Sequence, residues 1–127
     1  MGERKVLLVE DERPITKAIA TLLEANDLSV DIAPTAETAL TQIASNSYDL
    51  LVVDASLPDQ SGFALCQTLR LREDFDDLPI VLMTHRNTEI EARKSKAVGA
   101  TAILTKPFGP AQLRVALAPF VQLESLE

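Results

Sequence analysis

Short apolar segments alternate with longer amphipathic segments five times along the chain. The apolar segments cover residues 5–9, 28–32, 50–53, 79–83 and 101–104. In the stretches between them, apolar residues recur mainly at intervals of three and four, which is the spacing of one helix face. Strands that alternate with helices are typical of stacked βαβ units with a parallel sheet. The pattern therefore predicts an α/β fold.

The character of the strands predicts their places in the sheet. Residues 5–9 and 50–53 are apolar almost throughout, as expected when helices cover both faces of a strand. Leu28, Val30 and Ile32 alternate with polar residues, which favours a half-buried strand at the sheet edge. We expect a single flavodoxin-like (βα)5 sandwich whose parallel five-stranded sheet has the order 2-1-3-4-5.

The helices are predicted from their ends and their apolar faces. Pro14 suits a first helical turn, Thr35 is a candidate N-cap, and Gly99 ends the fourth helix, which spans residues 88–98. That helix is polar on most faces, so we expect it to pack weakly. The expected inward positions, helix by helix, are Ile15, Ala18, Ile19 and Leu22; Ala36, Ala39, Leu40 and Ile43; Leu65, Leu69 and Leu71; Ile90, Lys94 and Ala97; and Leu113, Leu117, Phe120 and Val121.

Composition narrows the class of protein. The 127 residues, of which 46% are hydrophobic, suit one domain over 1–127 with a real core. No apolar run approaches the ~20 residues that span a bilayer, so we expect a cytoplasmic protein with no membrane contact. Cys66 is the single cysteine, which excludes an internal disulfide. The net charge of −7 argues against direct nucleic-acid binding.

Polar side chains follow four of the predicted strands, at the point where each strand ends. Glu10 and Asp11 follow the first strand, Asp54 the third, Thr84 the fourth and Lys106 the fifth. Ligands of an open parallel sheet bind outside the carboxyl ends of its strands. In the expected strand order, Glu10 and Asp11 lie directly beside Asp54. We therefore expect all five side chains to converge at one edge.

This set of side chains suits phosphoryl chemistry. Three carboxylates repel one another, so a cation is needed among them, and oxygen ligands favour Mg²⁺. Asp54 is then the natural nucleophile, because carboxylates form aspartyl phosphates. Thr84 could donate a hydrogen bond to a phosphoryl oxygen, and Lys106 would spread its charge. Any one of these residues alone could be a turn former, a cap or a surface lysine; their joint placement favours a functional site.

These residues resemble the receiver domain of two-component response regulators. The likeness lies in Glu10-Asp11, Asp54, Thr84 and Lys106-Pro107-Phe108, each after its strand, and in the loop over residues 54–62 that runs through Leu57-Pro58 to Gly62. It covers essentially the whole chain.

The resemblance implies a phosphoprotein switch for signal transduction. Asp54 would take a phosphoryl group from a sensor histidine kinase or a histidine phosphotransfer protein in a phosphorelay. Asp11 and Asp54 would bind Mg²⁺ together with the backbone carbonyl of Ser56, and Glu10 would help through water. Thr84 and Lys106 would bind the phosphoryl oxygens. Such a domain catalyses only its own phosphorylation and dephosphorylation, so it is not an enzyme in the usual sense; the resemblance also implies a cis Lys106–Pro107 bond.

The chain departs from this family at two positions near the site. Ile103 stands where receiver domains usually carry Tyr or Phe, the ring that moves inward as the Thr moves to the phosphate. His85 stands where a small residue is common, and it could crowd the phosphodonor, confer pH sensitivity or point to solvent. Ser56 and Arg86 occupy positions that tune autodephosphorylation in similar domains.

Three functions remain open at this stage. The first is a phosphorylatable receiver that signals to a downstream protein partner or effector domain. Its contact surface would consist of the fourth helix, the fifth strand and the last helix. The last helix is also a candidate homodimer surface. The second is a non-phosphorylated receiver-like interaction module, which Ile103 and His85 favour weakly. The third is a phosphatase of the haloacid-dehalogenase type, which needs a second Asp where this chain has Ser56.

Overall fold

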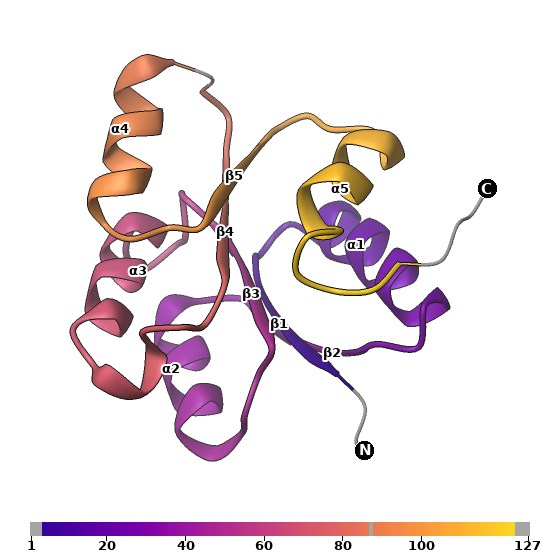
Figure 1. Ribbon diagram of the computed structural model, residues 1–127, viewed down its shortest axis with the longest axis horizontal. Helices are drawn as coiled ribbons and strands as arrows, with labels where there is room; N and C mark the ends of the chain where they lie inside the picture. The colour runs from indigo at the N-terminus through magenta and orange to yellow at the C-terminus, as the bar shows by residue number, and fades with distance from the viewer. Residues whose placement is uncertain (1–3, 87, 124–127) are drawn as a thin grey trace.

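One parallel sheet of five strands forms the centre of the molecule. The structure is a computed structural model that describes residues 4–86 and 88–123 (Figure 1). The strands are β1 (Lys5–Val9), β2 (Ser29–Ala33), β3 (Leu50–Asp54), β4 (Ile80–Thr84) and β5 (Ala102–Thr105). They are ordered β2-β1-β3-β4-β5, with every neighbouring pair parallel. The predicted fold, strand order and edge position of β2 are confirmed.

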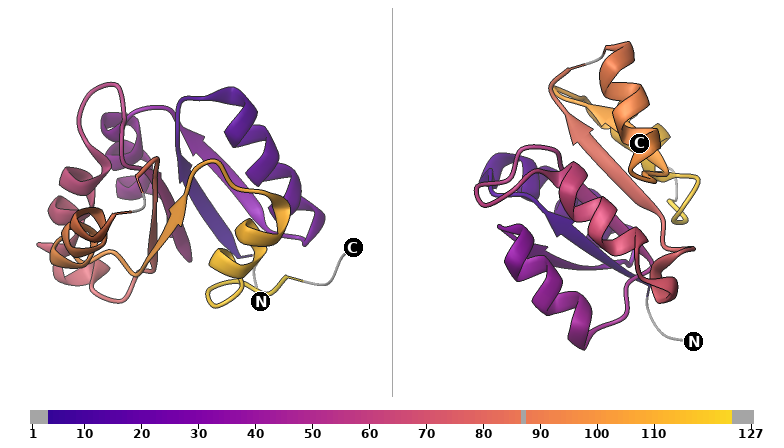
Figure 2. Two further views of the ribbon diagram at one scale, coloured as in Figure 1. Left: turned by 90° about the horizontal axis from the view of Figure 1, so that it is seen from above. Right: turned by 90° about the vertical axis from the view of Figure 1, so that its left-hand side faces the viewer.

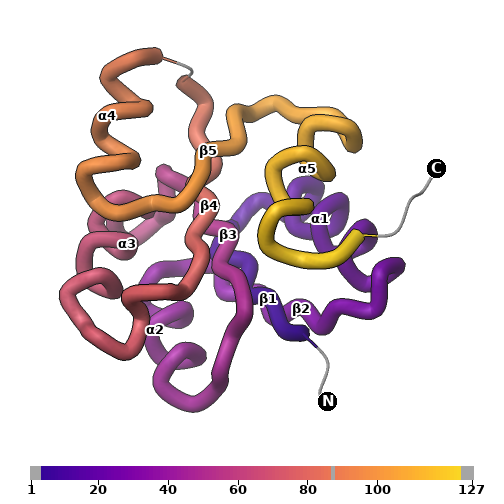
Figure 3. Tube along the Cα trace, in the orientation of Figure 1, coloured from indigo at the N-terminus to yellow at the C-terminus, as the bar shows by residue number. Residues whose placement is uncertain are grey.

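Helices cover both faces of this sheet. They are α1 (Arg13–Ala25), α2 (Ala36–Ser45), α3 (Gly62–Arg70), α4 (Glu89–Ala97) and α5 (Pro110–Leu117), with a 3-10 turn η1 (Glu73–Phe75) after α3. Figure 2 shows α1 and α5 on one side of the sheet and α2, α3 and α4 on the other. The tube in Figure 3 follows the chain from the indigo first strand to yellow α5, which lies beside α1. No described helix is both long and apolar enough to cross a membrane.

The core consists of two apolar layers, one on each side of the sheet. Alternate residues of β1 divide between them: Leu7 packs towards α2 and α3, whereas Leu8 packs towards α1 and α5. All residues of β3 and β4 are buried. This explains why those strands are apolar on both faces, since helices cover each face.

Capping side chains define where several helices begin. Pro14 lies in the first turn of α1, as predicted. The hydroxyl oxygen of Thr35 accepts a hydrogen bond from the Thr38 N–H at 3.0 Å, which confirms Thr35 as the N-cap of α2. Ser61 and Thr88 cap α3 and α4 in the same way. Each cap satisfies a backbone donor that the helix leaves free.

The inward faces of four helices differ from the prediction at particular positions. Leu71 is 83% exposed because α3 ends at Arg70 and the chain turns away. On α4, the predicted inward residues Ile90, Lys94 and Ala97 are all exposed, Ile90 to 74%, while Ser95 is buried. The face of α4 that is buried depends on how the helix packs against β5. The spacing of apolar residues along the helix does not specify that packing.

Smaller differences concern the two helices on the other side of the sheet. Ala18 is exposed, and Thr16 and Leu23 lie with Ile19 on the buried face of α1. Helix α5 ends at Leu117, so Phe120 and Val121 pack from the segment that follows it. The inward positions Leu113 and Leu117 are confirmed.

Candidate functional site

The sheet register brings the polar strand ends together. Val9 is paired with Val53, so Glu10, the next residue, reaches the edge beside Asp54. Asp54 is paired with Met83, which precedes Thr84, and the Lys106 N–H donates to the Thr84 carbonyl at 2.7 Å. The prediction that these residues converge at the carboxyl edge of the sheet is therefore confirmed.

Four of these polar side chains are buried. The exposed fractions are 1% for Glu10, 3% for Asp54, 4% for Thr84 and 4% for Lys106. Asp11, in contrast, is exposed at the rim. Charged residues are rarely buried unless they are paired with an opposite charge. The buried carboxylates of Glu10 and Asp54 therefore need a cation close to them.

Lys106 is the cation that pairs with these carboxylates. Its Nζ lies 2.9 Å from Glu10 Oε1, 3.3 Å from Asp54 Oδ2 and 3.5 Å from Glu12 Oε1. Glu12 was not predicted as a site residue, although the run Glu10-Asp11-Glu12 was a signal that could have found it. The lysine thus neutralises part of a dense negative cluster.

Burial and charge move the pKa values of this cluster. Burial raises the pKa of Glu10, and the hydrogen bonds from Lys106 and from the Glu12 N–H oppose that rise. For Lys106, burial lowers the pKa, but the hydrogen bond to Glu10 and the charge of Asp54 outweigh it, so the pKa is raised. Lys106 is therefore a permanent cation at neutral pH.

The loop after β3 holds the Asp54 carboxylate from the other side. The Ser56 N–H donates to Asp54 Oδ1 at 3.2 Å. Ser56 also bridges to Ser61, and the Gly62 N–H donates to the Ala55 carbonyl at 2.9 Å, which closes the loop back on β3. A Cβ at Gly62 would lie 2.2 Å from the Asp54 carbonyl oxygen, so only glycine permits this close approach.

Thr84 is buried at the same edge, and its hydroxyl is engaged within its own loop. Its Oγ1 accepts a hydrogen bond from the Arg86 N–H at 3.1 Å. The next residue, His85, is exposed to solvent and also lines a cavity next to Asp54, so the structure is consistent with both its solvent-facing and its crowding interpretation. Ile103 is partly buried on β5.

The carboxylates form a group that fits a hard cation. One oxygen from each of Glu10, Asp11 and Asp54 lies within 4.8 Å of the others. Oxygen-only donors with several negative charges are the ligands that Mg²⁺ prefers. The residues present therefore fit the expected metal.

A cavity of about 400 Å³ opens next to Asp54. Its walls come from the loops after β3 and β4 and from α4, and they include Ser56, Thr84, Glu91 and Lys94. Sequence reasoning missed Glu91 and Lys94 as site neighbours; their separation of three residues, which places them on one helix face, was the available signal. Asp54 is itself among the residues that line this cavity.

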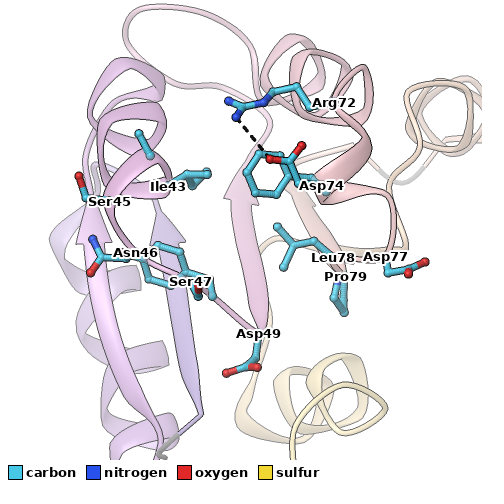
Figure 4. Close-up of a pocket in the computed structure, with 13 residues that line it drawn as sticks. Ile43, Ser45, Asn46, Ser47, Asp49, Arg72, Asp74, Asp77, Leu78 and Pro79 are labelled. Carbon is cyan, nitrogen blue, oxygen red and sulfur yellow. Dashed lines mark ion pairs between the residues drawn. The ribbon is translucent and has the colours of Figure 1, made fainter.

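A larger cavity of about 670 Å³ lies at the opposite end of the sheet (Figure 4). It is bounded by Asp49 and Pro79, which precede β3 and β4, and by the ion pair of Arg72 with Asp74 at 3.6 Å. None of the residues at the carboxyl edge lines it. It is therefore separate from the site.

The sequence matches the family model described as the response regulator receiver domain over residues 6–118. The chain belongs to this family. Receiver domains bind Mg²⁺ at an acidic pocket and interact with histidine kinases and downstream effectors. The cis Lys106–Pro107 bond that the resemblance implied is present.

Individual relatives agree with this assignment. The phosphate regulon transcriptional regulatory protein PhoB of Rhizobium meliloti (strain 1021) is 35% identical over 109 residues, or 86% of this receiver domain and 48% of PhoB. The regulatory protein VanR of Enterococcus faecium is 33% identical over 109 residues, or 86% of this chain and 46% of VanR. The chain thus spans about half the length of these curated relatives.

Solved structures of receiver domains superpose closely. The chemotaxis response regulator CheY4 of Vibrio cholerae has a TM-score of 0.88 at 28% identity, with coverage of 94% of this chain and 100% of that one. The non-phosphorylated HemR receiver domain of Leptospira biflexa has a TM-score of 0.85 at 28% identity, covering 98% and 99%. The fold of this receiver domain is that of its family.

Proposed function

We propose that residues 1–127 form a single receiver domain that is switched by phosphorylation of Asp54. The observation that carries the proposal is the setting of this carboxylate. Asp54 is buried, its Oδ2 lies 3.3 Å from Lys106 Nζ, and it borders a cavity of about 400 Å³. A nucleophile, a fixed cation and an access route therefore meet at one point.

The donor would be a phosphohistidine of a sensor histidine kinase or a histidine phosphotransfer protein. A carboxylate oxygen of Asp54 attacks phosphorus and forms the P–O bond. The P–N bond of the donor breaks, and its electron pair stays on the imidazole nitrogen, which is then protonated. Lys106 and the Thr84 hydroxyl would bind the phosphoryl oxygens. The Thr84 hydroxyl hydrogen, which now points to the Arg86 carbonyl oxygen at 3.5 Å, would donate to the phosphoryl group instead.

The metal ligands in this proposal are Glu10, Asp11, Asp54 and the backbone carbonyl of Ser56, with Glu10 acting through water. The clustering of the three carboxylates supports this set. When bound, Mg²⁺ supplies positive charge that offsets the charge of the phosphoryl oxygens. Lys106 meanwhile holds Glu10 and Asp54 in place, because its ammonium contacts both carboxylates.

The output would be a change in partner binding. The domain would act as a cytoplasmic switch that catalyses only its own phosphorylation and dephosphorylation. Helix α4, β5 and α5 are the proposed contact surface for a downstream protein partner or effector domain, and α5 for a homodimer. Exposed apolar side chains on two of these elements, Ile90 and Val115 at 74% each, support this choice.

Intact-mass spectrometry with acetyl phosphate and Mg²⁺ tests the assignment. We expect the wild-type chain to gain the mass of one phosphoryl group and the Asp54→Asn variant to gain none. Asp77→Asn is the matched control, because Asp77 is exposed and distant from the site edge. A gain in Asp54→Asn would refute the acceptor. No gain in folded wild type would favour a non-phosphorylated interaction module.

A further inference from the structure

Helix α4 is held loosely against the rest of the molecule. Ser95 is its single buried residue among those described, and its Ile90 side chain is 74% exposed. A helix stabilised by so little burial can shift its position at small cost in free energy. A new attraction at one point on α4 would therefore be enough to change where it sits.

Two charged side chains of α4 face the cavity that borders Asp54. Glu91 and Lys94 line it together with Thr84 and Arg86. The Oε1 atom of Glu91 is buried and has no hydrogen-bond partner among the described residues. In its present position α4 thus leaves a buried polar atom without a hydrogen bond. A different position of the helix could provide a partner for this atom.

Lys94 carries a positive charge that is not committed to a carboxylate. Its Nζ lies 4.5 Å from the centroid of the Phe63 ring, in a cation–π contact. The ion pairs found among residues 4–86 and 88–123 do not include Lys94, whereas Lys106 contacts three carboxylates. Of these two lysines at the site, Lys94 is the one available to meet additional negative charge.

Phosphorylation would add such charge in this cavity. A phosphoryl group carries roughly −1.5 to −2 at neutral pH and offers several acceptor oxygens. Attraction between charges is stronger in a partly enclosed cavity than in bulk water. We propose that Lys94 binds the phosphoryl group on Asp54 and so draws α4 onto the site. This inference rests on the proposed phosphorylation of Asp54.

Such a contact would supply the readout that Ile103 cannot provide. Ile103 has no ring and no polar tip that could exchange positions between two states. Lys94 instead connects the site directly to the helix whose outer face carries Arg93 and Lys96. The phosphoryl group would then rearrange the α4 surface without an aromatic side chain on β5.

Hydrogen exchange with mass spectrometry tests this contact. The variant Lys94→Met keeps an apolar stem over Phe63 and removes the charge, and Lys94→Arg keeps the charge. Lys96→Met is the matched control, because Lys96 is exposed on the same helix and does not line the cavity next to Asp54. Each protein is treated with acetyl phosphate and Mg²⁺, its mass gain is recorded, and amide exchange is followed over Glu89–Ala97.

The expected results separate this inference from the proposed function. Phosphorylation should slow exchange over α4 about fivefold or more in wild type, Lys94→Arg and Lys96→Met, and should leave it unchanged in Lys94→Met. Equal slowing in Lys94→Met would overturn the inference and leave phosphorylation of Asp54 intact. No mass gain in wild type would overturn both. Loss of mass gain in Lys94→Met alone would place Lys94 in the transfer step and contradict its role as a contact of the finished aspartyl phosphate.

Discussion

The Nζ atom of Lys106 lies 2.9 Å from Glu10 Oε1, and both side chains are buried. The two residues follow β5 and β1, which are separated in the sheet by β4 and β3. The lysine side chain therefore crosses the ends of two strands and contacts Asp54 on the way. One cation thus ties three of the five strand ends together at the site.

Replacing Lys106 with Met should destabilise the fold. The substitution leaves Glu10 and Asp54 buried with no cation beside them, and breaking a buried ion pair in this way costs about 3–5 kcal/mol. Urea unfolding at neutral pH, without added metal, measures this change. Lys17→Met, at an exposed position of α1, should change the free energy of unfolding little. Equal stability of Lys106→Met and wild type would contradict a structural contribution from the pair.

Replacing Gly62 with Ala should distort the loop that holds Asp54. The added Cβ would lie 2.2 Å from the Asp54 carbonyl oxygen, which is backbone and cannot rotate away. We expect a loss of about 1–3 kcal/mol in unfolding free energy, as for other overpacked sites, and slower phosphorylation of Asp54. Gly109→Ala should be milder, since its Cβ would meet only the flexible Gln112 side chain at 3.0 Å. Comparable losses in the two variants would argue against the close approach at Gly62.

The contribution of Asp59 to stability should depend on pH. Its carboxylate accepts hydrogen bonds from the Ala36 and Glu37 N–H groups, both at 3.0 Å, and these bonds hold its pKa below the ordinary value of 3.8. A group with a lowered folded-state pKa stabilises the protein above the unfolded-state pKa, and this stabilisation is lost as the pH falls through the folded-state pKa.

The measurement is the urea midpoint of Asp59→Ala against wild type over a range of pH. The variant should unfold at lower urea at pH 7, and the difference should shrink as the pH falls below 3.8. Asp77→Ala, at an exposed position, is the control and should show little difference at either pH. A difference for Asp59→Ala that stays constant with pH would show that the charge of Asp59 is not responsible.

Arg70 should be much more important for stability than its neighbour Arg72. The Arg70 guanidinium donates to the carbonyl oxygens of Gly99 at 2.9 Å and Phe75 at 2.5 Å, which joins α3 to the segments before β4 and β5. Arg70→Met should cost roughly 1.5–3 kcal/mol in unfolding free energy, the range for hydrogen bonds to charged groups. Arg72→Met loses an exposed ion pair with Asp74 and a cation–π contact with the Phe75 ring, and should cost less, because exposed contacts of both kinds are weak. Thermal unfolding of the two variants provides the comparison.

The sequence by itself determined the alternation of strands and helices, the strand order and the polar residues at the strand ends. These features are readable because they depend on local patterns: a strand covered on both faces must be apolar throughout, and a parallel sheet gathers its carboxyl ends at one edge. The expected roles of Glu10, Asp11, Asp54, Ser56, Thr84 and Lys106 rest on that placement and on the family resemblance.

Only the tertiary structure decided which side chains meet within that placement. The contact of Glu12 with Lys106, the capping of α2 by Asp59 and the position of Lys94 over Phe63 each join segments far apart in the chain. The exposed positions of Ile90 and Leu71 have the same origin, because helix rotation and helix ends are set by packing against neighbours. Periodicity along one segment carries no information about the segment that packs against it.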